Sequence, residues 1–331
     1  MKMICLIHTA TVLLAGAFIC AAPSVSAADT AELRARAKTE FGVVPDKMPG
    51  AEHDTPELVA LGRKLFSDPR LSVNDRQSCA SCHVLDRAGV DHLPTARGAK
   101  GQRTARNTPT VLNAGFQFAQ FWDAHATSLV AQAREPMLNP AEMGMPDEAS
   151  VERKLAALPE YRAAFEQAFT GTNRAVSFVG VTHALAAFER TLVTHDRFDD
   201  FLKGDDRALT APELKGLETF FSAGCTFCHK GPLLGGTTTK VLGEEIPYPD
   251  DGEAGGARND EFKVPMLRNV ALTAPYFHHG KIATLEEAIR KMSYHQVGRE
   301  LPDDEVEAIA AFLRTLTDKA RTDVTAETVL K

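Results

Sequence analysis

The sequence is poor in cysteine and in tryptophan, and it has no excess of positive charge. Among 331 residues there are 6 cysteines and 1 tryptophan, and Cys5 and Cys20 fall in the N-terminal segment. The other cysteines lie in two short blocks, so no cysteine is left for a structural disulfide framework. A formal net charge of −7 argues against a nucleic-acid partner and favours a basic protein or a small molecule.

Long apolar runs are also scarce, and the clearest one is N-terminal. Lys2 is followed by the apolar run "TATVLLAGAFICAA" and then by the small-residue site Val25-Ser26-Ala27, the pattern of a secretory signal peptide. An uncleaved anchor is the alternative, but the run is short for a bilayer span of about 20 residues. We therefore expect residues 1–27 to be a signal peptide, and the mature chain to be periplasmic and without a membrane span.

Alternating strand-like patterns are scarce as well. Apolar residues spaced three and four apart predict helices in residues 147–169, 177–193 and 302–317, and Pro302 with acidic neighbours opens the last one. Residues 234–260 are rich in glycine, proline and acids, which predicts a long surface loop. A composition of 44% apolar and 24% charged residues is ordinary for a globular protein. The predicted fold is mainly α.

What the sequence does contain is the pattern Cys-x-x-Cys-His, twice. The two blocks are Cys79, Cys82 and His83, and Cys225, Cys228 and His229. On a helical turn this spacing puts both sulfurs and the imidazole on one face, and the pattern is the attachment signature of c-type haem. A zinc site and a thioredoxin-like thiol pair are the alternatives. We predict two covalent haems with the two histidines as proximal iron ligands.

Other similarities accompany the two blocks. "PELVALGRKLF" precedes the first block and "PELKGLETFF" the second, while "TPTVLNA" follows the first and "VPMLRNV" the second. This pattern indicates an internal duplication. We predict two related cytochrome c-like helical domains with one haem each, divided near Gly204: residues 28–204 form the first domain and residues 205–331 the second.

The chain resembles the bacterial di-haem cytochrome c peroxidases and, more distantly, the di-haem enzyme that matures methylamine dehydrogenase. The resemblance runs from about Pro56 to Thr317 and depends on both haem blocks together with "GVDHLPT", "RNTPTVLNA", "AQFWD", "LRNVALTAPYFHHG" and "LEEAIRKM". It implies that hydrogen peroxide is reduced at the first haem, with electrons that enter at the second from a reduced cytochrome c or small copper protein. The alternatives are an oxidase that modifies side chains of a partner protein and a non-enzymatic di-haem electron carrier. We also expect a homodimer.

The resemblance assigns roles to individual residues. Met292 matches the methionine that completes the coordination of the second haem, although by spacing alone it belongs to an ordinary core stripe. Glu142 matches the acid–base residue of the peroxide site, with Gln132 and Pro136 in the same distal pocket. Trp122 matches a residue between the two haems, where it also packs as core.

Two further expectations follow from the same resemblance. The maturation enzyme resembles a variant in which a tyrosine, in place of the methionine, binds the iron of the second haem. Met292 therefore favours the peroxidase, although Tyr294 and His295 lie close by in the sequence and keep the alternative open. A calcium ion is expected at the domain interface, where oxygen atoms suit it. Its expected ligands are Asn107, Thr273 and Pro275.

In one place the sequence departs from the family. The peroxide haem of the family often has a loop histidine as sixth ligand, sixteen residues after the proximal histidine, and this ligand leaves when the second haem is reduced. That position is Ala99 here, while His92 lies seven residues earlier and His125 lies near Trp122. We expect an open or water-bound site at the first haem, and His92 is the competing switch ligand.

Overall fold

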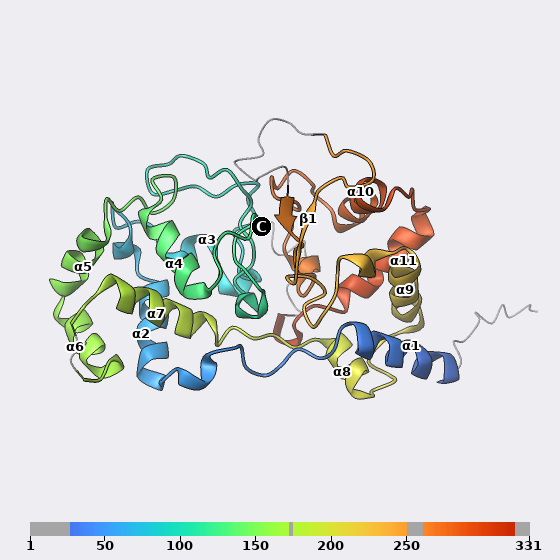
Figure 1. Ribbon diagram of the computed structural model, residues 1–331, viewed down its shortest axis with the longest axis horizontal. Helices are drawn as coiled ribbons and strands as arrows, with labels where there is room; N and C mark the ends of the chain where they lie inside the picture. Colours follow the sequence, from blue (N-terminus) through green and yellow to red (C-terminus); the bar gives the residue numbers. More distant parts are fainter. Residues whose placement is uncertain (1–26, 172–174, 250–260, 322–331) are drawn as a thin grey trace, which may run out of the picture.

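The computed structural model describes residues 27–171, 175–249 and 261–321 and is mainly helical (Figure 1). The α-helices in these ranges are α1 (Ala27–Glu40), α2 (Pro56–Phe66), α3 (Cys79–Cys82), α4 (Leu129–Leu138), α5 (Glu148–Ala156), α6 (Pro159–Ala168), α7 (Phe178–Glu189), α8 (Arg197–Lys203), α9 (Ala211–Ser222), α10 (Leu285–Val297) and α11 (Asp303–Arg314). The prediction of a mainly α fold is therefore confirmed. The predicted signal peptide lies outside the described residues except for Ala27.

Non-α elements in the described ranges are short. β1 (Thr239–Val241) pairs antiparallel with β2 (Glu261–Lys263), at the edges of the segment predicted as a long loop. Single 3-10 turns occur at Ala51–His53, Pro69–Leu71, Leu85–Arg87, Ala114–Phe116, Cys225–Phe227, Val270–Leu272 and Lys319–Arg321. Among the helices of these ranges, none is long and apolar enough to cross a bilayer.

Two lobes lie side by side in Figure 1, one formed by α2 to α7 and the other by α9 to α11. Each lobe is organised around two helices that cross at a glycine: α2 on α7 at Gly62, and α9 on α11 at Gly216. A Cβ at Gly62 would overlap the carbonyl oxygen of Ala184, and a Cβ at Gly216 would overlap that of Ala308. The missing side chain therefore allows the same close crossing in both lobes.

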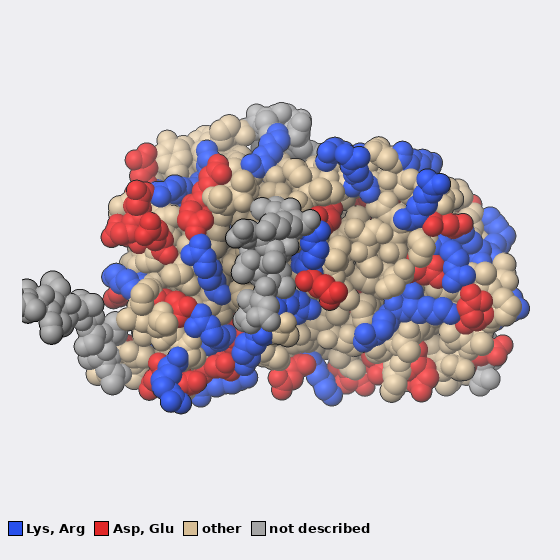
Figure 2. Space-filling view, turned by 180° about the vertical axis from the view of Figure 1, so that it is seen from behind, with Lys and Arg blue, Asp and Glu red and all other residues tan. Residues whose placement is uncertain are grey.

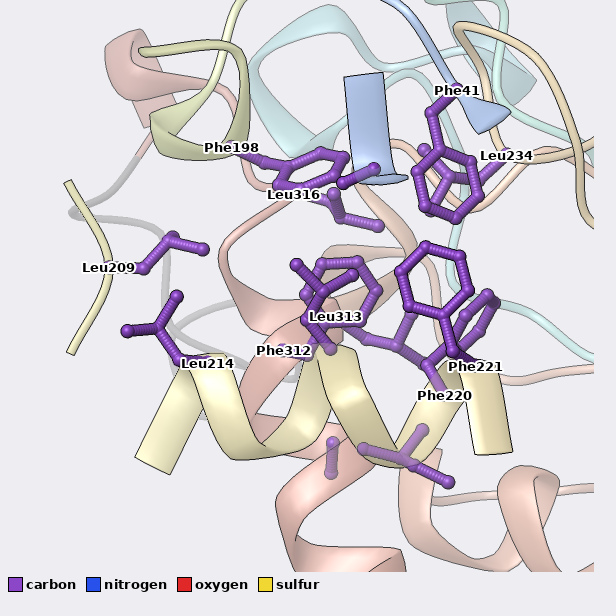
Figure 3. Packing of buried hydrophobic residues seen from close by; sticks show 14 of the residues in the cluster. Phe41, Phe198, Leu209, Leu214, Phe220, Phe221, Leu234, Phe312, Leu313 and Leu316 are labelled. Atoms are coloured by element: carbon purple, nitrogen blue, oxygen red, sulfur yellow. The ribbon is translucent and has the colours of Figure 1, made fainter. Parts of the chain in front are cut away.

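The described apolar side chains form one large core in each lobe. In the second lobe, Phe312 of α11 packs edge-on against Phe220 of α9 and Phe198 of α8, with ring centroids 5.4 and 5.2 Å apart (Figure 3). Phe41, which follows α1, joins the same core. The domain boundary near Gly204 stays a prediction, and packing would assign α1 and α8, which precede it, to the second lobe.

The two lobes meet at a buried polar junction. Asn113 and Asn269, which have matching places after the two blocks, both have left-handed backbone, with φ of 60° and 64°. Each donates a side-chain hydrogen bond to the hydroxyl of Thr194, at 2.7 and 3.0 Å. Nearby, the fully buried Arg268 donates to both carboxylate oxygens of Asp196 at 2.6 and 2.5 Å. These bonds fix the loops that follow the two blocks relative to one another.

Candidate haem and peroxide sites

Both predicted proximal histidines are half-buried and oriented by the main chain. His83 donates its Nδ1–H to the carbonyl of Gly89 at 3.1 Å, and His229 donates to that of Leu234 at 2.8 Å. Burial lowers the pKa of both imidazoles, which keeps them neutral. A neutral imidazole that donates from Nδ1 presents the lone pair of Nε2, the form that binds a metal.

The cysteines of both blocks lie on helical turns. Cys79 and Cys82 bound α3, and the second block begins with a 3-10 turn at Cys225. Burial raises the pKa of the Cys79 and Cys225 thiols to about 12 and that of Cys82 to about 11. Thiol exchange needs a thiolate, so these neutral, half-buried thiols fit the redox-pair alternative poorly.

The second block opens onto a cavity of about 520 Å³, a size typical of ligand and cofactor sites. Its walls are mostly apolar, and Met292 of α10 lines it together with His229 and both cysteines of the block. The helix stripe that ends at Met292 also lines it, through Leu285, Ala288 and Ile289. Tyr294 is 39% exposed, and His295 is buried with its Nδ1 hydrogen-bonded to the carbonyl of Ile246 at 3.0 Å. The residues of this cavity fit a covalently attached haem, for which the imidazole of His229 and the thioether of Met292 would be the candidate iron ligands.

The regions after the two blocks correspond at a constant separation of 156 positions. The isolated bridge Gln120–Ala126 corresponds to Tyr276–Ile282. Ser128 caps the start of α4 and Thr284 caps the start of α10, each through its hydroxyl oxygen. At the same separation Pro136 of α4 corresponds to Met292 of α10. A proline has no ligand atom, so the first unit lacks a thioether where the second unit has one.

Glu142, the predicted acid–base residue, lies on the turn after α4. Its carboxylate accepts a hydrogen bond from the Asn139 amide at 3.0 Å, and burial raises its pKa above the ordinary value. Its negative charge also raises the pKa of Cys79 and Cys82, so the carboxylate is near the first haem block. Gln132 and Pro136, the other predicted distal residues, lie on α4 itself.

The loop that holds Ala99 packs directly on this turn. Ala99 donates its backbone N–H to the carbonyl of Glu142 at 2.6 Å, and its own carbonyl accepts from Asn74 at 2.5 Å. Gly98 permits the approach, because a Cβ there would overlap the carbonyl oxygen of Ala141. A small residue therefore stands beside Glu142, at the position where the family often has a ligand histidine.

His92, the competing ligand, is buried elsewhere. Its Nδ1 is 2.8 Å from the carbonyl of Ala274 and its Nε2 is 3.2 Å from that of Arg87. Burial lowers its pKa. Both ring nitrogens would have to leave these carbonyls before His92 could bind iron. His125 is exposed and hydrogen-bonds Asp123 and Glu135, at 2.5 and 2.8 Å.

Trp122 belongs to the first lobe but lines the cavity of the second. Its Nε1–H donates to the carbonyl of Asn107 at 2.9 Å, and its ring meets His278 and Phe262 edge-on. The expected calcium ligands Asn107, Thr273 and Pro275 line the same cavity. Asn107 donates its amide to the carbonyl of Leu93 at 2.8 Å, which leaves its side-chain oxygen as the atom for a cation.

Two buried ionisable residues near these sites were not foreseen from the sequence. Lys263 lines the second cavity and donates to the carbonyl of Ala119 at 2.9 Å, and burial lowers its pKa to about 8. Lys263 corresponds to Asn107 at the constant separation of 156 positions. This correspondence was the only feature of the sequence that pointed to Lys263. Glu189 at the end of α7 is 6% exposed.

Comparison with known proteins agrees with this geometry. The family model "Di-haem cytochrome c peroxidase" matches residues 56–207. The cytochrome c551 peroxidase of Nitrosomonas europaea is 44% identical over 275 residues, which cover 80% of this chain and 81% of the relative. The chain belongs to the di-haem cytochrome c peroxidase family. Membership confirms the predicted family and the predicted class of enzyme, a peroxidase, and implies two haems.

Other relatives extend the picture. The cytochrome c551 peroxidase of Pseudomonas aeruginosa is 44% identical and covers 78% of both chains. The methylamine utilization protein MauG of Methylorubrum extorquens is 35% identical over 89% of this chain and 87% of its own. Among solved structures, a MauG-like protein associated with microbial copper homeostasis has a TM-score of 0.73 at 29% identity and covers 84% of this chain and 94% of its own.

Proposed function

We propose that this chain is a periplasmic di-haem peroxidase that reduces one hydrogen peroxide to two waters, consuming two electrons and two protons. The electrons come from a reduced cytochrome c or a small copper protein. Cys79 and Cys82 hold the first haem and Cys225 and Cys228 the second, through thioether bonds. When bound, the haems supply the iron at which peroxide is cleaved and the store for the incoming electrons.

The residues of the first unit handle the protons. Glu142 takes the proton from the peroxide oxygen nearer the iron and returns it to the leaving oxygen, which is general acid–base work. Its raised pKa suits both steps, because the carboxyl has to bind and release a proton in turn. Gln132 and Pro136 on α4 line the same pocket.

The residues of the second unit handle the electrons. Met292 offers a thioether, which stabilises ferrous iron and raises the potential. Trp122, held by its hydrogen bond to Asn107, lies at the wall between the lobes and is the bridge to the first haem. Asn107, Thr273 and Pro275 bind one calcium ion and keep this interface in register.

The observation that carries the proposal is the placement of Glu142. A half-buried carboxyl whose charge acts on both cysteines of the first block is needed for peroxide cleavage and has no role in an electron carrier. The two lobes arose by internal duplication, which is supported by the matched helix crossings and by the constant separation that pairs Pro136 with Met292.

The test is steady-state oxidation of reduced cytochrome c by hydrogen peroxide with the purified di-haem protein. We expect two cytochromes oxidised per peroxide consumed, with saturation in both substrates. An electron carrier would exchange electrons with cytochrome c but consume no peroxide. Acid–acetone extraction should leave two haems on each chain, because thioethers do not dissociate; one extractable haem would contradict the attachment at that block.

A second function, oxidation of side chains in a partner protein, is favoured by the similarity to MauG over most of the chain. Met292 lines the second cavity while Tyr294 is exposed, which favours the peroxidase. The two functions differ in the electron source. With hydrogen peroxide as the oxidant, a peroxidase turns over with reduced cytochrome c as its only electron donor, whereas the oxidase would need its protein substrate.

The charge of the chain bears on the electron donor that it binds, and a homodimer is the assembly that we expect. On the face shown in Figure 2 acidic and basic side chains are interspersed, and the whole chain has a formal net charge of −7. We propose that a basic electron donor docks on the acidic chain and that the chain forms a homodimer. Sedimentation of the holoprotein with and without calcium would measure both the dimer and its dependence on the ion.

A further inference from the structure

Glu189, the last residue of α7, is a buried carboxyl to which the peroxidase mechanism gives no role. It is 6% exposed, and among the described residues its carboxylate makes neither a hydrogen bond nor an ion pair. The adjacent Arg190 does not neutralise it by contact, because its guanidinium is paired with both oxygens of Asp54 at 2.6 and 2.7 Å. Burial raises the pKa of Glu189 to about 8.

The two helix crossings show which way Glu189 faces. At Gly62 the partner helix presents Phe188, whose Cβ would lie 2.8 Å from an added Cβ; at Gly216 it presents Phe312, at 2.9 Å. Phe188 therefore corresponds to Phe312, and the next residue, Glu189, corresponds to Leu313.

Leu313 lines the cavity that also contains His229 and Met292. The matching position in the first lobe faces the space beside the first haem block. An independent observation agrees: after burial, the charge of Glu189 is the largest influence that raises the pKa of Cys79. The carboxyl of Glu189 is thus directed at the first haem site, next to its first attachment point.

An unpaired carboxyl at this place is costly to the fold. Burying a polar group without a hydrogen bond destabilises a fold, and the second lobe has the same helix crossing with a leucine. Packing alone therefore does not require an acid. The acid is explained if its partner is in the haem pocket and its charge responds to what happens there.

We propose that Glu189 couples a proton to the electron at the first haem: its carboxylate takes up one proton from solvent when this haem gains one electron by way of the second haem, and releases the proton when the electron leaves. The added electron makes the pocket more negative, which favours the neutral acid. Charges interact strongly in such a dry pocket. Proton uptake keeps the net charge of the pocket constant and makes the electron easier to accept.

Other ionisable groups on the helices that pack around α7 do not compete for this role. Those that are partly buried have partners of their own: Lys64, Glu148, Glu152, Lys154 and Arg190. The rest are exposed: Glu57, Arg63, Arg134, Glu135, Arg153 and His183. In the first block, thioether formation removes the titration of the cysteines. Glu142 is the other acid near Cys79, so it has to be controlled for.

The test is a spectroelectrochemical titration of the di-haem protein between about pH 6 and 9, following each haem separately. In the parent protein the midpoint potential of the first haem should fall with rising pH, with a slope approaching one proton per electron. Glu189→Gln and Glu189→Leu, the second of which copies the residue of the other lobe, should both lose this slope. The second haem should behave alike in all variants, and Glu142→Gln should keep the slope of the first.

Infrared difference spectra give a second measurement. Reduction of the parent should produce a carbonyl band of a newly protonated carboxylic acid, and this band should be missing in Glu189→Gln. A slope that persists in both Glu189 variants, or that disappears in Glu142→Gln, overturns the proposal. A purely structural role would change haem content or the potential at every pH equally.

The inference depends on the proposed function only in requiring a haem at the first block. If that block carries no haem, both fall together. A bound haem whose potential does not depend on pH removes the role of Glu189 and leaves the peroxidase proposal intact, since the titration requires no peroxide turnover.

Discussion

The two glycine crossings allow one substitution to be tested in each lobe. Gly62→Ala and Gly216→Ala each add one methyl group where it would overlap a main-chain carbonyl oxygen and lie 2.8 or 2.9 Å from a phenylalanine Cβ. Real Cβ atoms essentially never approach other atoms within 3.0 Å, so the two helices must separate. A main-chain oxygen cannot rotate away as a side chain can.

The size of the effect follows from two opposing contributions. Overpacking a core costs about 1–3 kcal/mol, and contact with the main chain puts these sites at the upper end. Alanine is favoured over glycine inside a helix by about 1 kcal/mol. Each substitution should therefore destabilise its lobe by about 2 kcal/mol, which lowers the melting temperature of a unit of 150–250 residues by about 4–8 °C.

The assay is urea unfolding of the holoprotein, followed by circular dichroism and by the absorbance of each haem. Gly62→Ala should affect the first haem and Gly216→Ala the second. The exposed Ala60 of α2 provides the control, because Ala60→Gly measures the helix-propensity contribution alone. Unchanged or increased stability of either glycine variant would refute the close crossing, and equal effects on both haems would refute the independence of the lobes.

Three other predictions test the sites. Glu142→Gln keeps the shape and removes the proton acceptor, so peroxide turnover should fall by about two to four orders of magnitude at unchanged haem content. Glu148→Gln, which changes a partly exposed acid of α5 paired with Arg134, should turn over like the parent. A near-parental Glu142→Gln would move the acid–base role elsewhere. Met292→Ala should lower the potential of the second haem and slow electron uptake, and a parental spectrum would make Met292 only a core residue. Because Ala99 cannot bind iron, paramagnetic resonance of the ferric protein should show a strong high-spin signal; two low-spin signals, one of them lost in His92→Ala, would contradict the open site.

The helices were largely predictable from periodicity, and their ends were governed by local chemistry. The helical pattern of residues 147–169 is divided into α5 and α6 at Pro159, because proline starts a helix well but cannot continue one. Residues 250–260 of the loop predicted over residues 234–260 lie outside the described residues. Residues 234–249 include β1, whose pairing with β2 was not predicted. Each of those strands has only three residues, too few to show alternation.

Sequence motifs also indicated the candidate ligands, but not the residues that face them from other elements. Glu189, followed by Arg190 near the end of a helix, has the sequence pattern of a solvated ion pair, and the packing of α2 on α7 buries it instead. Phe41 lies far from α11 in sequence, yet both contribute to one core. Contacts of this kind depend on how helices cross, which no local pattern specifies.

The differences between the two lobes bear on the choice between a peroxidase and an electron carrier. At corresponding positions the first lobe has Pro136 and Glu189 where the second has Met292 and Leu313. Met292 and Leu313 suit electron storage alone, since a thioether stabilises reduced iron and an apolar wall excludes water. Peroxide cleavage needs a vacant iron position and groups that exchange protons. The first lobe has Pro136, a residue without a ligand atom, and two acids, Glu142 and Glu189, whose pKa values are raised by burial. Because an unpaired buried acid costs stability, its presence in one lobe only favours proton chemistry at that lobe's haem and electron entry at the other.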